Sequence, residues 1–130
     1  MIATIQPEGW AKPKGYANGM LADGRLYIGG QIGWNADQVF VTRDFVGQME
    51  QALSNIVAIV RAAGGEAHNI TRLTWYVVDK KEYLARQREV GDAYRRVMGR
   101  HFPVMTMVIV AGLVEDEALV EIEANAELGA

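Results

Sequence analysis

Two strand-like runs near the end of the chain differ in how their apolar residues are spaced. From Val120 to Leu128 apolar and polar residues alternate strictly, which predicts a strand with one buried face and one polar face. The run from Met105 to Val110 is apolar on both faces apart from Thr106, a pattern typical of a strand that is covered on both sides. We expect these two strands to pair antiparallel through the polar turn at residues 114–118.

The first half of the chain reads as a hairpin followed by a helix. Residues 15–29 are strand-like on either side of an Asp-Gly pair at positions 23–24, which favours a tight hairpin turn. Apolar residues then recur every three or four positions over residues 45–63, which predicts a helix with one apolar stripe. Thr42 or Asp44 can cap the start of this helix.

The second half adds one more strand and one more helix before the two terminal strands. Residues 70–78 are rich in Thr, Val, Tyr and Trp and predict a strand, and residues 81–100 predict a helix with Leu84 among its inward side chains. The simplest arrangement is an α+β fold with one sheet and both helices on one face. The other face still carries apolar side chains, which implies a partner, most simply another copy of the chain.

Composition narrows the function classes. The 130 residues are enough for one domain, residues 1–130, and half of them are hydrophobic. A formal net charge of −3 argues against general binding of nucleic acid. The absence of cysteine and the presence of only two separated histidines predict no metal site. Because neither a signal peptide nor a membrane-spanning run is seen, we expect a soluble, cytoplasmic protein without a membrane partner.

Three short motifs carry a resemblance to a known family. They are the glycine-rich run at residues 28–32 (Ile-Gly-Gly-Gln-Ile), the Phe102-Pro103 strand entry and the Glu-Ile-Glu-Ala sequence at residues 121–124. In this order and spacing they resemble the Rid family of reactive-intermediate deaminases, also called the YjgF or L-PSP endoribonuclease family. The resemblance covers nearly the whole chain from Lys14 onward.

The resemblance implies both an architecture and an activity. It implies a chorismate-mutase-like α+β fold of the bacillus type, with one mixed sheet and two helices on one face. It also implies a homotrimer with three sites in the clefts between subunits. Members with full motifs hydrolyse imines and enamines of 2-oxo acids, such as 2-aminoacrylate, to the keto acid and ammonia without a cofactor.

The family site carries over only in part. Tyr16 matches an aromatic ring that lines the pocket, Gly30 matches a backbone contact to the ligand, and Glu121 matches the glutamate that holds the attacking water. Glu121 is therefore the catalytic candidate. The substrate-binding candidates are Tyr16, Gly30, Gln31, Met105, Thr106 and Met107.

The main departure is at Met105, where active deaminases carry an arginine that clamps the substrate carboxylate. Methionine offers no hydrogen-bond donor, so we expect little activity on 2-aminoacrylate and a preference for a larger conjugated enamine such as 2-aminomuconate. Arg95, Arg96 or Arg100 could replace the missing clamp, although a solvated helix face also accounts for them.

We therefore expect a hydrolase, an enamine or imine deaminase with altered specificity that acts on a small molecule. The alternative is a non-catalytic trimer that binds a small ligand or regulates. Endoribonuclease activity fits poorly with an acidic chain that lacks a histidine pair. The substrate and the pathway stay open at this point.

Several of these candidate site residues also have a purely structural explanation. Glu121 alone could be a solvated strand residue, since carboxylates are rarely buried, and Tyr16 could be a packing residue. Trp10 and Trp34 could form an aromatic lid, but core or interface packing also explains them. Glu121 is preferred over Glu123 because the expected pairing places it opposite the stretch that begins at Met105.

Overall fold

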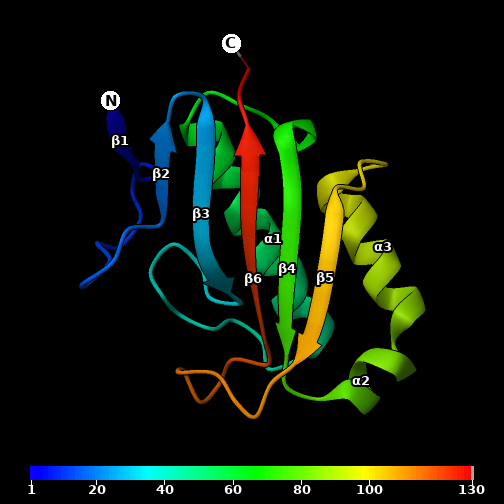
Figure 1. The fold of residues 1–130 in the computed structure, drawn as a ribbon. Coiled ribbons are helices and arrows are strands. Elements are labelled where there is room, and N and C mark those ends of the chain that lie inside the picture. Colours follow the sequence, from blue (N-terminus) through cyan, green and yellow to red (C-terminus); the bar gives the residue numbers. More distant parts are fainter. Residues whose placement is uncertain (130) are drawn as a thin grey trace.

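The computed structural model describes residues 1–129, which form one six-stranded mixed sheet with helices on one face (Figure 1). The strands are β1 (Ile2–Ile5), β2 (Gly19–Ala22), β3 (Arg25–Ile32), β4 (Ile70–Val77), β5 (Val104–Ile109) and β6 (Val120–Glu127). The helices are α1 (Phe45–Ala62), α2 (Lys80–Ala85), α3 (Gln87–Met98) and the short 3-10 helix η1 (Ala67–Asn69). The spatial order of the strands is β1-β2-β3-β6-β4-β5.

The core lies between the sheet and helix α1, which runs behind β3, β6 and β4 in the view of Figure 1. Helix α1 packs on β3, β6 and α3. Leu53 and Ile56 of α1 are fully buried, as are Leu26, Leu73 and Ile122 on the facing strands. This arrangement confirms the predicted α+β fold with one mixed sheet and its helices on one side.

Strand β6 is central, and its alternating pattern is confirmed. Val120, Ile122 and Ala124 are buried on the helix side, whereas Glu121 and Glu123 are only partly buried on the helix-free face. The strand pairs antiparallel with β3 on one side and with β4 on the other. The alternation of apolar and polar residues therefore indicates a strand with one buried face and one partly exposed face.

The predicted pairing of the two terminal strands is wrong. Strand β5 pairs in parallel with β4, and β4 separates it from β6. A parallel neighbour requires a crossover, and α2 and α3 supply it between β4 and β5. The chain then passes below the end of β4 in Figure 1 and enters the gap between β3 and β4 as β6. Glu121 consequently stands opposite Ile32 and Tyr76, and not opposite the strand that carries Met105.

Strand β5 forms an edge of the sheet. Its apolar pattern predicts that both of its faces are covered, but within residues 1–129 most of its side chains are exposed. Val104 is 63% exposed, Met105 44%, Val108 40% and Ile109 47%. Helix α3 covers part of one side, so that Met107 is half-buried against the core. The apolar edge of β5 is defined here by these four exposed residues.

The predicted helix over residues 81–100 is two helices, broken at Arg86. The backbone of Arg86 lies outside the helical region, at φ −122° and ψ 23°. Its guanidinium meets Glu89 at 2.6 Å, Asp44 at 2.7 Å and Glu82 at 3.1 Å. A carboxylate from the distant start of α1 thus helps to fix the break, and Leu84, which was predicted to face inward, is exposed.

Two local predictions are confirmed by the backbone and its caps. The 23–24 turn joins β2 to β3, with φ of 50° at Asp23 and 82° at Gly24, as a tight hairpin requires. Asp44 caps α1 by accepting a hydrogen bond from the Gly47 amide at 3.0 Å. None of the helices within residues 1–129 is long and apolar enough to cross a membrane.

Candidate functional site

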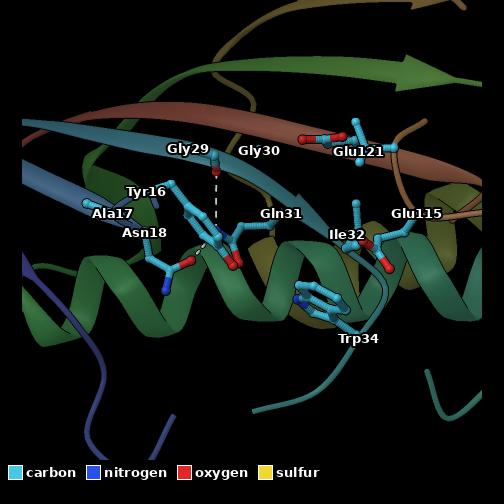
Figure 2. Close-up of a pocket in the computed structure, with 11 residues that line it drawn as sticks. Tyr16, Ala17, Asn18, Gly29, Gly30, Gln31, Ile32, Trp34, Glu115 and Glu121 are labelled. Atoms are coloured by element: carbon cyan, nitrogen blue, oxygen red, sulfur yellow. Dashed lines mark hydrogen bonds between the residues drawn. The ribbon is translucent and has the colours of Figure 1, made fainter. Parts of the chain in front are cut away.

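One cavity brings together the residues that flank the glycine-rich end of β3 (Figure 2). Its volume is about 380 Å³, which lies within the usual range of small-molecule sites. We call it the Glu121 cavity. It is lined by Tyr16, Ala17, Asn18, Gly29, Gly30, Gln31, Ile32, Trp34, Val114, Glu115 and Glu121.

The backbone of β3 approaches the carboxylate of Glu121 closely at Gly30. The register between β3 and β6 shifts between Ile28 and Gln31, so the two intervening glycines form an irregularity in the ladder. A Cβ atom added to Gly30 would lie 1.9 Å from Oε2 of Glu121. Glycine is therefore required at this position for the glutamate to keep its present place.

Glu121 has the electrostatic surroundings of a proton-transfer group. Burial raises the pKa of its carboxyl above the ordinary value, and the nearby charge of Glu123 raises it further. Within residues 1–129 no group donates a hydrogen bond to this carboxylate that would oppose the shift. A carboxyl group whose pKa is raised by desolvation can exchange protons nearer to neutral pH.

Glu123 differs from Glu121 although both lie on the same face of β6. The Tyr76 hydroxyl donates a hydrogen bond to Oε1 of Glu123. This bond is the main cause of the raised pKa of the Tyr76 phenol, with burial and the charge of Glu121 adding to it. Tyr76 thus occupies the carboxylate of Glu123 and leaves that of Glu121 available to a ligand or water.

A network of amides holds the other wall of the Glu121 cavity. The Gln31 side chain donates from Nε2 to Oδ1 of Asn18 at 3.1 Å and to the Gly29 carbonyl at 3.3 Å. Asn18 in turn donates to Oε1 of Gln6 at 2.9 Å. Gln31 is buried and stands opposite Ile122 in the register, so its side chain supports the glycine run from the helix side of the sheet.

Buried Gln48 of α1 fixes the loop that carries Val114 and Glu115. Its Nε2 donates to the carbonyls of Thr42 at 3.1 Å and Glu117 at 2.9 Å, and its Oε1 accepts from the Leu119 amide at 2.8 Å. These three bonds tie the loop before β6 to the start of α1. The position of the cavity wall therefore depends on a residue that lines no part of the cavity.

Aromatic side chains form the rim of the Glu121 cavity. Tyr16 is 52% exposed and its hydroxyl accepts a hydrogen bond from Gln38 at 3.3 Å. Trp34 lines the cavity and packs on Phe40 with ring centroids 5.8 Å apart. Sequence reasoning named Tyr16 as a site candidate but did not select Asn18, Val114 or Glu115. No local pattern marks these three, because their place depends on how the loops fold over β3 and β6.

Met105 and Met107 lie in a second cavity, between α3 and the edge of the sheet. It also has a volume of about 380 Å³, and we call it the Trp75 cavity. The register sets Met105 beside Leu73 and Met107 beside Trp75, so both face the helices, whereas Thr106 pairs with Thr74 on the other face. Within one chain these three candidates are not joined to Glu121. The cavity is lined by Trp75, Tyr83, Gln87, Val90, Gly91, Tyr94, Arg95, Phe102, Met105 and Met107.

The three arginines considered as replacement clamps have different surroundings. Arg95 lines the Trp75 cavity but pairs with Asp92 at 2.5 Å. Arg96 pairs with Glu50 of α1 at 2.8 Å. Arg100 belongs to the lining of neither cavity. Residues 1–129 also contain no group of three His, Asp or Glu side chains that could hold a metal ion.

Comparison with known proteins gives extended matches over this fold. A family model described as Endoribonuclease L-PSP matches residues 10–128. The 2-iminobutanoate/2-iminopropanoate deaminase of Capra hircus is 34% identical over 115 residues, which cover 88% of this chain and 80% of that protein. The RutC family protein UK114 of Drosophila melanogaster is 32% identical over 121 residues, covering 92% and 84%.

A solved structure agrees with these sequence matches. The crystal structure of the Rid family protein YyfA from Yersinia pestis aligns with a TM-score of 0.84 at 29% identity, over 98% of this chain and 99% of that one. The matched region contains both cavities, with Met105 where the resemblance predicts an arginine. The chain therefore belongs to the endoribonuclease L-PSP family, which is the Rid or YjgF family that its sequence motifs predicted.

Proposed function

We propose that the protein is a deaminase that hydrolyses an imine or enamine to a carbonyl compound and ammonia. The observation that carries this proposal is Glu121, a carboxyl group with a raised pKa that lies against Gly30 in a cavity of ligand size. The Capra hircus relative is itself named a 2-iminobutanoate/2-iminopropanoate deaminase. A single proton-transfer group is enough for this reaction, because water and the imine supply all other atoms.

In the proposed mechanism, Glu121 acts first as base and then as acid. The carboxylate takes a proton from water as the water oxygen bonds to the imine carbon, and the Glu121 carboxyl passes that proton to the nitrogen as the C=N double bond becomes single. Glu121 then takes the hydroxyl proton of the carbinolamine and gives it to the amino nitrogen, so that the C–N bond breaks, the C=O bond forms and ammonia leaves. Water is consumed and ammonia released, and Glu121 returns to its starting state.

We further propose a homotrimer whose active clefts lie between subunits. Each cleft would combine the Glu121 cavity of one subunit with the Trp75 cavity of its neighbour. The apolar edge of β5 supports this assembly, because a sheet edge with exposed Val104 and Val108 is a natural surface for contact with another copy. The assembly also gives Met105 a place in the same site as Glu121.

The substrate would differ from 2-aminoacrylate. Met105 cannot form the charge-assisted pair that an arginine makes with a carboxylate. Loss of one partner of such a pair typically weakens binding by ~2–5 kcal/mol, or ~30- to several-thousand-fold. A larger conjugated enamine such as 2-aminomuconate would suit the methionine-lined side better.

Ammonia and keto-product release from a panel of enamines, including 2-aminoacrylate and 2-aminomuconate, tests the proposal. We expect Glu121→Gln to lower turnover by ~10²–10⁴-fold, because glutamine keeps the shape but is not a usable base. The matched variant Glu123→Gln should keep most of the activity, since its carboxylate is engaged by Tyr76. The assignment of Glu121 would be wrong if Glu123→Gln abolished turnover and Glu121→Gln did not.

A non-catalytic trimer that binds a small ligand is the second candidate. It is favoured by the lack of an unpaired cationic clamp in the Trp75 cavity, where the lining Arg95 is paired with Asp92. In that case neither the wild type nor the Glu121 variant would release ammonia from any enamine on the panel, while both would bind a ligand with similar affinity.

A further inference from the structure

Trp75 holds the one buried polar side-chain atom of residues 1–129 that has no hydrogen-bond partner. The residue is 3% exposed, and its Nε1 is unpaired. A buried indole N–H normally has an acceptor, and leaving it unpaired costs stability. An unsatisfied group of this kind in a folded core therefore calls for a specific explanation.

The unpaired indole belongs to the lining of the Trp75 cavity. The surrounding side chains are mostly aromatic or apolar, and the cavity contains no carboxylate in its lining. Tyr94 and Phe102 stack with centroids 5.4 Å apart and planes tilted by 9°. An apolar cavity with aromatic walls and an unpaired donor has the chemistry of a site for a planar ligand that carries one acceptor.

Two other polar groups of this cavity already have partners. The Tyr94 hydroxyl donates to the His101 carbonyl at 2.6 Å, and burial raises the pKa of this phenol to about 12, so it stays neutral. Arg95 is paired with Asp92 at 2.5 Å. Gln87 and Tyr83 also line the cavity, but Gln87 is exposed and Tyr83 only half-buried, so water can reach them. Within residues 1–129, the N–H of Trp75 is thus the one buried side-chain donor of this lining that has no partner.

We propose that the Trp75 cavity binds an uncharged, planar apolar group, with a single acceptor atom on the ligand taking a hydrogen bond from Nε1 of Trp75. This inference rests on the proposed function, since it describes the second half of the same cleft. It names the substrate class as imines or enamines whose substituent is an aromatic or conjugated group with a neutral acceptor, such as a carbonyl oxygen.

A carboxylate in the same position is disfavoured, so a dicarboxylate such as 2-aminomuconate would have to place its conjugated chain here and keep both carboxylates outside this cavity. Moving an anion into an apolar cavity without a charged partner is strongly unfavourable, and one neutral N–H does not compensate for the lost hydration. Met105 and Met107 add polarizable apolar surface but no donor. The cavity should therefore prefer a ketone to a carboxylate of the same shape.

Binding of three matched probes to the full-length protein tests this inference. Acetophenone has a planar ring and one carbonyl acceptor, isopropylbenzene has nearly the same shape without the acceptor, and benzoate carries the charge. We expect acetophenone to bind more tightly than benzoate in calorimetry. In ¹⁵N-resolved NMR spectra acetophenone should move the Nε1–H proton signal of Trp75, identified by its loss in Trp75→Phe, downfield as a new hydrogen bond does, whereas isopropylbenzene should cause no such downfield shift.

Substitutions separate the hydrogen bond from cavity shape. Trp75→Phe should weaken acetophenone roughly 3- to 10-fold, the usual net effect of one neutral hydrogen bond, and change isopropylbenzene less than about 2-fold. The control Trp10→Phe, at a residue that lines neither cavity, should leave acetophenone binding unchanged. Met105→Arg keeps Trp75 and introduces a cation, so it should reverse the preference in favour of benzoate.

The inference is overturned if benzoate binds the wild type at least as tightly as acetophenone, if Trp75→Phe weakens acetophenone and isopropylbenzene equally, or if none of the probes binds. The variant Glu121→Gln keeps the two proposals apart. It should abolish enamine hydrolysis while acetophenone binding stays unchanged. Retained binding without any wild-type turnover would reject the deaminase alone, and turnover without binding in the Trp75 cavity would reject the present inference alone.

Discussion

Strands β5 and β6 follow each other in the sequence but have opposite environments. Strand β5 is the more apolar of the two, yet it lies at the edge of the sheet with Val104 and Val108 exposed. Strand β6 carries three glutamates, yet it is the central strand, and Ile122 is fully buried. Hydrophobicity along the chain therefore does not by itself tell which strand the chain buries.

The difference shows what each pattern reports. The alternation of β6 matches its surroundings within one chain. Helix α1 covers the apolar face, and the face that carries Glu121 is partly exposed to solvent. The continuous apolar run of β5 is not covered within one chain, and in the proposed trimer another copy would cover it. The proposal thus assigns β6 to the stability of the fold and β5 to assembly, and the following substitutions test that division.

The largest effect is expected in the middle of β6. Ile122→Ala removes a fully buried side chain between α1 and the sheet, and such truncations lower the free energy of unfolding by about 2–5 kcal/mol. Chemical denaturation at a fixed protein concentration measures the change. Truncation of exposed Val41, which is far less buried, should change the same quantity by less than about 0.5 kcal/mol.

A charge on β5 should act on assembly instead. Val108→Asp places a carboxylate on the helix-free side of the edge strand, beside Tyr76 in the register. We expect it to weaken association at least ~10²-fold, since an interface buries a charge unfavourably without a partner. Light scattering should show a wild-type mass near three times that of the 14.3 kDa chain and a variant mass near that of one chain.

The matched control for this prediction is Val41→Asp, which adds the same charge at an exposed valine outside β5 and should leave the mass unchanged. A monomeric wild type at micromolar concentration would remove the proposed role of β5 in a trimer.

A smaller effect is expected where β3 meets β6. In Gly30→Ala the new methyl group would overlap the Glu121 carboxylate, which is the flexible end of a side chain and can move away. We expect turnover to fall roughly 10- to 100-fold with little change in melting temperature. Gly29→Ala is the matched variant, because its Cβ would meet only ordinary contacts, with the Ala17 carbonyl at 3.4 Å. Equal losses in the two variants would argue against a positioned Glu121.

The smallest effect concerns the pH dependence of stability. Burial raises the pKa of Glu121 in the folded state, so ionisation of this carboxyl opposes folding at neutral pH. Glu121→Gln should therefore stabilise the protein at pH 7, by less than about 1 kcal/mol because solvent screens a half-exposed group. This gain should disappear as the pH falls through the raised pKa toward the ordinary value of 4.5. Urea denaturation at pH 7 and pH 4.5 measures it, and a gain that grows on acidification would contradict the sign.

Local features of the fold were predictable because they depend on neighbouring residues. The 23–24 turn, the cap at Asp44 and the alternation of β6 are each encoded within a few positions. Strand order was not predictable in the same way. Two strands that follow each other in the sequence pair only if neither has a more favourable neighbour elsewhere in the sheet, and the local pattern does not show this. The helix break at Arg86 also escaped the pattern, since one of its carboxylate partners, Asp44, comes from the start of another helix.

The residues of the candidate site also differ in whether neighbouring or distant residues determine their role. Gly30 and Glu121 could be selected from short motifs, and the structure places them in contact. The preference for Glu121 over Glu123 rested on a wrong strand pairing, and the support it now has is different: Tyr76 occupies Glu123. The unpaired indole of Trp75 has no sequence signal, because pairing of a buried donor depends on every element around it.

The central place of the last strand also determines when the protein can fold. Strands β3 and β4 are adjacent to β6 on either side and not to each other, so the two parts of the sheet stay separate until the C-terminal residues exist. A growing chain cannot close this sheet while β6 is still unsynthesised. Premature termination before residue 120 would therefore leave two exposed strand edges, the kind of surface that aggregates or is degraded.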